Sequence, residues 1–243
     1  MVEISKKYKL KNTVTFGFVN WIGLWTLYKK EVLRFLIVWI QTLLSPIISS
    51  LLFLLVLALA IGNERADVLG YPFITFLAPG LIAMQVIQQA FSHSSSSFMI
   101  GKIQGNIVDI LYAPLSPGEV TTAVVLASAT RSFMIAFISI IIFYFLVDIE
   151  IRNIYAVIFF TLISSIILGC IGVIAGLWAE KFDHMATVTS FIIIPLSFLS
   201  GTFYSIERLP QILQTISKCN PFFYMIDGFR YGFLYTSPSP RDV

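Results

Sequence analysis

Charged residues are scarce in this chain, at 12% of 243 residues, whereas soluble domains carry about 25%. Apolar residues reach 57%, and this surplus predicts a protein whose surface faces lipid. The net charge is only +3, and no Arg/Lys-rich stripe is interleaved with base-stacking aromatics. These patterns exclude nucleic acid as the expected partner.

Acidic residues are absent from the long apolar runs, which argues against proton- or sodium-driven carriers, because those place Asp, Glu or His in mid-membrane. The sequence also lacks a GxxxxGK[ST] phosphate loop, an HExxH motif and any nucleophile–base grouping. If the protein moves a substrate uphill, another subunit must supply the energy. Cys170 and Cys219 lack metal-ligand spacing and are expected to be unpaired thiols.

Five continuous apolar runs predict an all-α, polytopic membrane protein. Each run can cross a hydrocarbon core of about 30 Å as a helix. A helix satisfies its backbone hydrogen bonds internally, as lipid requires. The predicted spans are Phe35–Ile61, Pro72–Phe91, Val120–Val147, Ile154–Trp178 and Met185–Phe203.

Lysines and arginines crowd before the first run, and this bias predicts a cytoplasmic N-terminus. Residues 1–34 are expected to include an amphipathic interfacial helix in which Lys30 and Arg34 face away from an apolar stripe. A helix packed against neighbouring spans is the alternative. The stripe consists of Trp21, Leu24, Trp25, Tyr28, Val32 and Phe35. The expected inside loops are 92–119 and 179–184, and the expected outside segments are 62–71, 148–153 and 204–234.

The longest cytoplasmic loop, GKIQGNIVDILYAPLSPGEV, is expected to hold a short amphipathic helix. Prolines end this helix before the third span starts. Held between two spans, it would act as a lever for a partner that grips it; an inert interfacial helix is the alternative. The pattern consists of Ile103, Ile107, Ile110 and Leu111, with Lys102, Asn106 and Asp109 between them, and then Pro114 and Pro117.

Arg131 is the one full charge well inside a run, where exposure to lipid would cost at least about 2.5 kcal/mol. It is therefore expected to face the bundle interior or a wet cavity, in contact with backbone carbonyls or with an anionic substrate group. His93, beside a run of serines, is expected to be an interfacial side chain without special chemistry; a ligand or proton carrier is the alternative. The fourth run carries a small-residue strip for close helix packing, made of Ser165, Gly169, Gly172 and Gly176.

After the fifth run the chain reads FLSGTFYSIERLPQILQTISKCNPFFYMIDGFRYGFL. Short helices are expected here, the last with Asn220 as N-cap and Pro221 as its first residue, and with Asp227 spaced to pair with Arg230. The segment resembles the C-terminal region of permease subunits of type-2 ABC exporters, which include bacterial polysaccharide and lipo-oligosaccharide exporters. The matching elements are Gly201, Phe203 and Tyr204, Leu209 and Pro210, Asn220 and Pro221, and Asp227 and Arg230, together with the earlier FLAPGLIAMQ and LYAPLSPGEV.

The resemblance covers about Trp21 to Leu234 and implies a membrane part made of two such chains, expected to be a homodimer, with six spans each. Two separate ATP-binding cassette subunits, which hold ATP and magnesium, would dock at the helix around Gly101 to Tyr112 and switch the dimer between inward- and outward-open forms. The chain itself would hold no cofactor and perform no enzymatic reaction. The coupling residues so implied are Lys102, Asn106, Asp109, Tyr112, Pro114 and Glu119.

The end of the chain departs from the family pattern, because LYTSPSPRDV stands where a sixth span is expected. This tail resembles a translated sequencing adapter. Residues 35–234 are therefore expected to form an incomplete transmembrane domain, and 235–243 to be non-native. A genuine five-span protein with an external, disordered tail is the alternative.

These patterns together predict a permease subunit of an ATP-driven exporter in the bacterial cytoplasmic (inner) membrane. Its substrate would be amphiphilic, glycan-bearing or drug-like. A non-transport helical scaffold or assembly protein and a membrane-embedded enzyme are the rival classes. The enzyme would need a polar catalytic cluster in one cavity, and the runs offer only Arg131 with scattered Ser, Thr and Gln.

Overall fold

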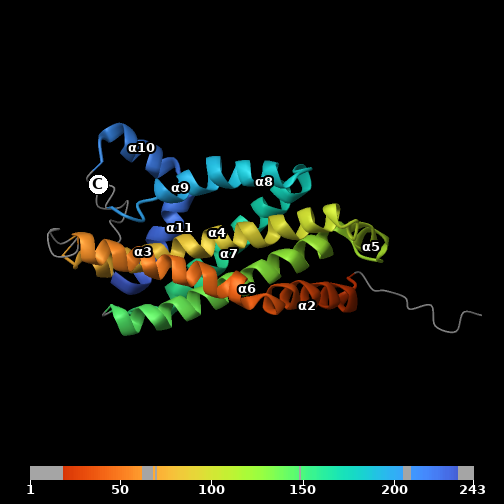
Figure 1. Cartoon of the computed structure of the whole chain (residues 1–243), viewed down its shortest axis with the longest axis horizontal. Helices are drawn as coiled ribbons and strands as arrows, with labels where there is room; N and C mark the ends of the chain where they lie inside the picture. The colour runs from red at the N-terminus through yellow and green to blue at the C-terminus, as the bar shows by residue number, and fades with distance from the viewer. Residues whose placement is uncertain (1–18, 62–67, 69, 148, 205–208, 235–243) are drawn as a thin grey trace, which may run out of the picture.

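The computed structural model describes residues 19–61, 68, 70–147, 149–204 and 209–234, and its elements are helices. They form an elongated bundle with α5 at one end and α10 at the other, here called the α5 end and the α10 end (Figure 1). In chain order they are α2 (Trp21–Ile37), the π-helical η1 (Ile40–Leu44), α3 (Ser45–Ile61), α4 (Phe73–Ile103), α5 (Ile107–Tyr112), α6 (Pro117–Leu146), α7 (Ile154–Trp178), α8 (Phe182–Val188), the π-helical η2 (Thr189–Ile193), α9 (Ile194–Phe198), α10 (Gln211–Cys219) and α11 (Pro221–Leu234).

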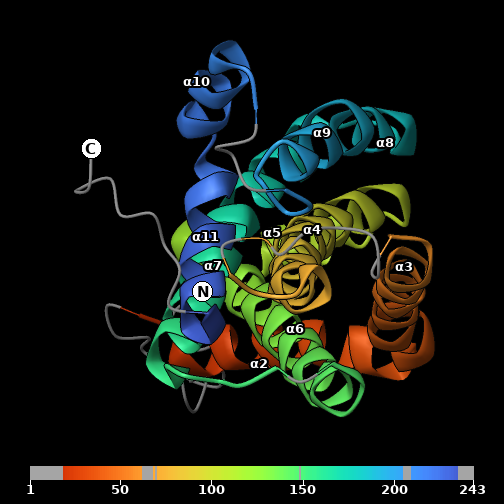
Figure 2. The same cartoon turned by 90° about the vertical axis from the view of Figure 1, so that its left-hand side faces the viewer.

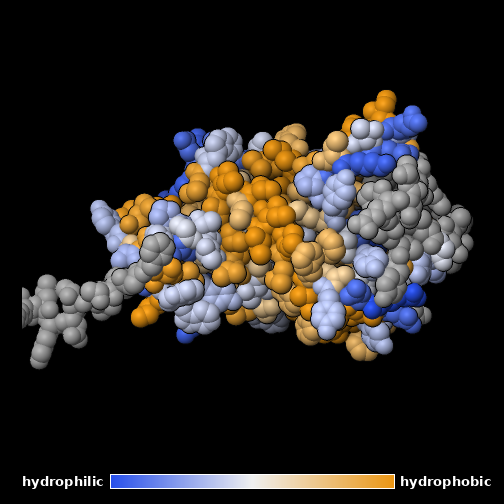
Figure 3. Space-filling view, turned by 180° about the vertical axis from the view of Figure 1, so that it is seen from behind, coloured by the Kyte–Doolittle hydropathy of each residue, from blue (hydrophilic) through white to orange (hydrophobic). Residues whose placement is uncertain are grey.

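Helix α4 is the centre of the bundle and contacts α3, α6, α7 and α11 (Figure 2). Its large side chains Phe76, Ile87 and Phe91 are fully buried in the main apolar cluster. The outer faces of the surrounding helices are apolar as well, and apolar residues gather around the middle of the molecule while hydrophilic residues lie toward its ends (Figure 3). This distribution is that of a bundle surrounded by hydrocarbon.

Small residues let α7 lie directly on α4. A Cβ added at Gly172 would lie 2.6 Å from the carbonyl oxygen of Phe91, and one added at Gly176 would lie 2.7 Å from that of Ser95. A Cβ added at Gly169 would lie 2.7 Å from the side-chain oxygen of Ser128 in α6. Ser165, which precedes these glycines, is fully buried and donates its hydroxyl hydrogen to the Thr161 carbonyl at 2.6 Å. The strip thus brings α7 into backbone contact with its neighbour.

Four of the described helices are long and apolar enough to cross a membrane: Ile40–Ala60, Phe73–Ile103, Pro117–Leu146 and Ile154–Trp178. The last has the bounds that the sequence predicts. The fifth predicted span, Met185–Phe203, corresponds to a shorter apolar helix, Phe182–Phe198, formed by α8, η2 and α9. Lys6, Lys7, Lys9 and Lys11 and the tail at 235–243 lie outside the described residues.

The first and second predicted spans have wrong boundaries. The N-terminal helix does not give way to the first span at Phe35; α2 continues to Ile37, and the chain bends before η1 starts at Ile40. The second span does not end at Phe91, because α4 continues for three more turns, to Ile103. Of the serines that suggested a polar end, Ser94 and Ser95 are buried and Ser96 and Ser97 are half-buried, so the run lies within the helix and does not mark its end.

The amphipathic stripe of α2 also differs from the prediction. The face that packs on the bundle contains Leu27, Glu31 and Phe35, all buried, whereas Trp21 and Trp25 are exposed. Helix α2 lies along α6, so it both packs against a span and presents aromatic rings to its surroundings. The face of α2 that packs against neighbouring helices is thus rotated away from the apolar stripe that the sequence predicts.

Candidate functional site

The exposed tip of the α5 end is an apolar patch on a short helix. Val108, Leu111 and Tyr112 are 47%, 76% and 86% exposed, and Asp109 lies exposed among them. Large side chains that are exposed together on a polar end of a protein indicate a contact surface. The predicted helix is shorter than its periodicity suggested, because Ile103 ends α4 and Gly105, at φ +75°, reverses the chain before α5 begins.

The side chain of Lys102 is hydrogen-bonded within the bundle. Its ammonium group donates to the carbonyl oxygens of Leu177 and Ala179, at 2.5 and 2.9 Å. These carbonyls lie at the C-terminal end of α7, where a cation is favoured by the helix dipole. Lys102 therefore joins the end of α4 to the end of α7.

Glu119 is buried and binds two backbone N–H groups on the other side of α5. Its carboxylate accepts hydrogen bonds from the backbone N–H groups of Asn20 and Ser116, each at 2.6 Å. The Ser116 side chain accepts from the Glu119 N–H in return, which completes a capping box at the start of α6. Asn20 also donates to the Pro114 carbonyl at 3.0 Å, so the start of α2 is bound to the loop that follows α5.

The predicted coupling residues therefore divide into two groups. Lys102, Pro114 and Glu119 build a frame that joins the ends of α2, α4, α6 and α7 around α5. Asn106 is exposed in the turn before α5, and together with Asp109 and Tyr112 it is available to a partner. A force applied to α5 would reach four helices through this frame.

Arg131 lies inside the bundle in the middle of α6. Its guanidinium donates to the Gln89 side-chain oxygen of α4 and to the Thr42 carbonyl of η1, at 2.5 and 3.1 Å. Thr42 in turn donates to the Phe35 carbonyl at 2.7 Å. Arg131 thus connects three segments where the chain bends between α2 and α3, and its described contacts are structural.

A buried charged cluster lies beside Arg131 and was not predicted from the sequence. Glu31 is 2% exposed; it pairs with Arg34 at 2.9 Å and accepts a hydrogen bond from Ser97 at 2.8 Å. The imidazole of His93, buried against Phe35, lies 3.9 Å from the same carboxylate. His93 is therefore not the interfacial side chain that the sequence suggested. Helical spacing would have indicated that Glu31 is buried, because Glu31 lies on the same helical face as Leu27 and Phe35.

A row of uncharged polar side chains runs along the remaining face of α4. Gln85, Gln88, Ser92 and Ser96 recur at spacings of three and four residues, which places them on one side of a helix. None of the four is buried, although most of α4 is. The row therefore lies on a partly exposed side of this central helix.

Arg230 organises the α10 end. It is 4% exposed, and its guanidinium donates to the carbonyls of Gly201 and Thr202 at 3.0 and 3.4 Å while lying 4.0 Å above the Phe76 ring. Gly80 leaves room for it, since a Cβ there would lie 2.9 Å from the guanidinium nitrogen. The arginine thus joins α11 to α4 and to the turn after α9.

The other residues of the predicted C-terminal motif also connect segments here. Asn220 caps α11 by accepting from the Phe222 N–H at 3.0 Å, and its amide donates to the Leu196 carbonyl of α9 at 2.7 Å. Phe203 stacks on Phe198, and the Tyr204 hydroxyl donates to the Phe198 carbonyl. Gly201 takes φ +74°, Pro210 precedes α10, Pro221 begins α11, and Asp227 lies one turn before Arg230.

Metal-binding clusters of three or more His, Cys, Asp or Glu do not occur within the described part of the chain. The polar side chains described above instead join helices to one another, at both ends of the bundle and around Arg131 in its middle.

Comparison with known proteins identifies the family. The ABC-2 type transporter family model matches residues 23–234. The inner membrane transport permease YadH of Escherichia coli (strain K12) is 33% identical over 220 residues, which cover 90% of this chain and 86% of YadH. Nodulation protein J of Rhizobium leguminosarum bv. viciae is 24% identical over 229 residues, covering 90% of this chain and 83% of that protein. The resemblance seen in the sequence is thereby confirmed: the chain belongs to the ABC-2 type transporter family, as the membrane component of an ABC transporter.

Proposed function

We propose that this chain is the permease subunit of an ATP-driven exporter and that separate ATP-binding subunits, which hold ATP and magnesium, dock on α5. The observation that carries the proposal is the exposed apolar tip formed by Val108, Leu111 and Tyr112. The frame around α5 supports it, because Lys102 and Glu119 would pass a push on this helix to the spans. Permeases of this family work with ATP-binding subunits.

The proposed topology places the α5 end in the cytoplasm and the α10 end outside the inner membrane. The lysines before the first span favour a cytoplasmic N-terminus, and α2 begins at the α5 end. The apolar helix Phe182–Phe198 is the proposed fifth span; at 1.5 Å per residue it reaches about 25 Å, near the lower limit for crossing. The exposed aromatic rings of α2 would then lie at the cytoplasmic headgroup level.

The polar face of α4 is the proposed lining of the substrate path, completed by a second copy of the chain. The side-chain amides of Gln85 and Gln88 would lack hydrogen-bond partners if they faced lipid, so this face calls for a polar neighbour. Gln85, Gln88, Ser92 and Ser96 supply neutral donors and acceptors and no charge. Among the amphiphilic, glycan-bearing and drug-like substrates, such a surface favours one with a hydroxyl-rich part.

Replacing Tyr112 with arginine should separate the permease from its ATP-binding subunits. Tyrosine is frequently a dominant residue in interfaces, and a loss of about 1.4 kcal/mol or more would weaken association at least about tenfold. The measurement is co-purification of the ATP-binding subunit with the tagged permease, together with the ATPase activity of the complex.

Tyr155→Arg is the matched control, because Tyr155 is 82% exposed and lies at the start of α7, toward the other end of the bundle. Equal retention of the ATP-binding subunit by both variants would contradict docking at α5. Failure of the unaltered permease to associate with any ATP-binding subunit would favour the rival, a membrane scaffold or assembly protein.

The native cysteines test the topology. Cys219 of α10 is exposed and should react with a membrane-impermeant maleimide in spheroplasts, whereas Cys170, on the outer face of a span, should not, because the reagent does not enter hydrocarbon. Cys219→Ser should abolish labelling. Asp109→Cys in that background should label only after lysis, and labelling of Asp109→Cys in intact spheroplasts would reverse the proposed orientation.

A further inference from the structure

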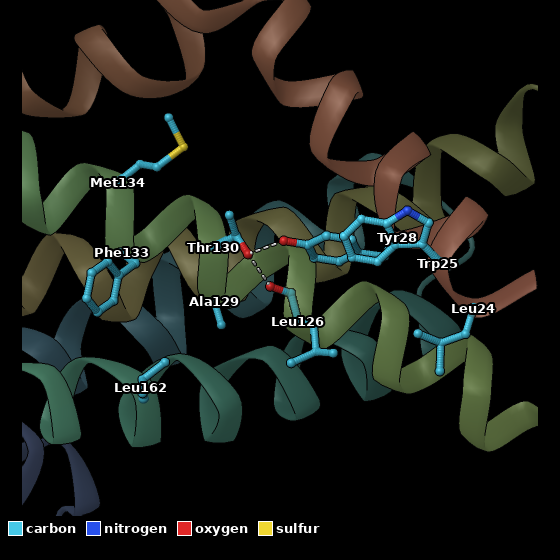
Figure 4. Close-up of a pocket in the computed structure, with 9 residues that line it drawn as sticks. All are labelled: Leu24, Trp25, Tyr28, Leu126, Ala129, Thr130, Phe133, Met134 and Leu162. Carbon is cyan, nitrogen blue, oxygen red and sulfur yellow. Dashed lines mark hydrogen bonds between the residues drawn. The ribbon is translucent and has the colours of Figure 1, made fainter. Parts of the chain in front are cut away.

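An apolar groove of about 480 Å³ lies between α2, α6 and α7, near the α5 end. Figure 4 shows the aromatic rings of Trp25 and Tyr28 at one side of it and Phe133 and Met134 at the other. Its volume falls within the range of small-molecule sites in proteins, about 300–1,000 Å³. The lining residues are Leu24, Trp25, Tyr28, Leu126, Ala129, Thr130, Phe133, Met134 and Leu162.

The two side-chain hydroxyl groups of the groove already have hydrogen-bond partners. The Tyr28 hydroxyl and the Thr130 hydroxyl are hydrogen-bonded at 2.9 Å, and Thr130 also bonds to the Leu126 carbonyl at 2.9 Å (Figure 4). The rest of the lining is hydrocarbon or aromatic ring. A polar ligand would therefore find few groups to bind, whereas a hydrocarbon chain would gain contact along the whole groove.

The surroundings of the groove identify the source of such a chain. Two of its three walls are membrane spans, and its rim residues Trp25, Leu126 and Leu162 are 62%, 42% and 41% exposed on the outer surface of the bundle. The opening therefore lies on the outer surface of the described bundle, where the available hydrocarbon is lipid. A second copy of the chain would have to cover the same face, and the polar face of α4, which calls for that copy, is a different surface.

Helix α2 supplies groups suited to a lipid headgroup. Trp25 and Tyr28 have amphipathic rings that prefer the headgroup level. Lys29 lies one helical turn after Trp25, on the flank of the same face, and is exposed. Its ammonium group would lie beside the phosphate of a lipid whose chain enters the groove, and it would favour a lipid with net negative charge.

We propose that this groove binds one acyl chain of an anionic phospholipid, with Lys29 beside the headgroup. The assignment to the cytoplasmic leaflet rests on the proposed topology; the site itself requires only that the chain spans a membrane. A bound lipid would fill the space between α2 and the spans and would hold α2 in place together with the Tyr28–Thr130 hydrogen bond.

Native mass spectrometry of the purified full-length permease, after exchange into detergent with phosphatidylglycerol or phosphatidylcholine, tests this site. The unaltered chain should retain one phosphatidylglycerol per protomer. Leu126→Trp, which fills the groove, should reduce retention at least about tenfold, a change of about 1.4 kcal/mol. Ile166→Trp is the matched control, because Ile166 is equally exposed on α7 but does not line the groove.

Lys29→Gln should keep lipid binding but lose the preference for phosphatidylglycerol over phosphatidylcholine, whereas Lys30→Gln, on the other side of α2, should keep it. Equal lipid retention by Leu126→Trp and Ile166→Trp would show lipid around the bundle only and would overturn the proposal. Conversion of a dimer to a monomer by Leu126→Trp would assign the groove to a second copy and would also overturn it. Because lipid retention does not depend on ATP, failure here is distinguishable from failure of the exporter proposal.

Discussion

Replacing Gly172 with alanine is expected to lower the thermal stability of the purified permease, although alanine is the better helix former by about 1 kcal/mol. The added Cβ would lie 2.6 Å from the Phe91 carbonyl oxygen and 3.0 Å from the Ser94 Cβ. The first contact is with backbone, so α7 and α4 would have to separate. Overpacking of this kind costs about 1–3 kcal/mol, and the looser packing along both helices would add to it. Leucine at the same position should prevent folding.

Gly118→Ala is the matched control for this prediction. Gly118 lies in the first turn of α6, and an added Cβ there meets nothing within 4 Å. This variant should therefore melt at or above the temperature of the unaltered chain. For a domain of this size, each kcal/mol corresponds to about 2–4 °C. Equal melting temperatures for the two alanine variants would contradict a backbone contact between α7 and α4.

Replacing Arg230 with methionine is expected to disrupt the α10 end and to abolish transport. Methionine would fill much of the volume but would leave the carbonyls of Gly201 and Thr202 without their donor and remove the contact with the Phe76 ring. Removing one partner from a buried charged hydrogen-bond network costs about 3–5 kcal/mol. The measurements are the melting temperature and amide hydrogen exchange in residues 199–204.

Arg230→Lys separates charge from geometry at this site. Lysine keeps the positive charge, but its compact ammonium group does not reproduce the planar guanidinium that bonds carbonyls while it stacks on a ring. It should recover part of the stability and none of the exchange protection at Thr202. Lys218→Met, on exposed α10, is the control and should change neither measurement. Normal melting and exchange in Arg230→Met would show that the turn after α9 is held by other contacts.

Hydropathy located the spans well where polar residues flank them. The fourth predicted run has the bounds of α7, Ile154–Trp178, because Asn153 caps its start and the chain turns polar just after Trp178. The first run has no polar residue that indicates where its membrane helix starts. The bend before η1 lies between two apolar segments, and its position depends on the Thr42 hydroxyl and the Arg131 guanidinium, which bind the backbone there.

The serines of α4 misled the prediction for a physical reason. A polar run in an apolar chain normally indicates a membrane boundary, yet small hydroxyl side chains can bond to their own helix backbone. Ser95 and Ser96 donate to the Ser92 and His93 carbonyls, one turn earlier. Their small size then allows α7 to approach, as the contact between Gly176 and Ser95 shows. Composition alone does not distinguish this packing from an exposed end.

The sequence by itself determined the class of protein, the approximate spans and the family, because apolar length, lysine distribution and the order of short motifs are properties of the chain in one dimension. Only the tertiary structure decided which polar residues meet. Glu31 and His93 are 62 positions apart in the sequence, and Glu119 reaches Asn20 across 99. Such pairs depend on how helices are placed around α4. Whether two polar groups come within about 3 Å of each other, as a hydrogen bond requires, depends on this packing, and residue spacing along the chain does not specify it.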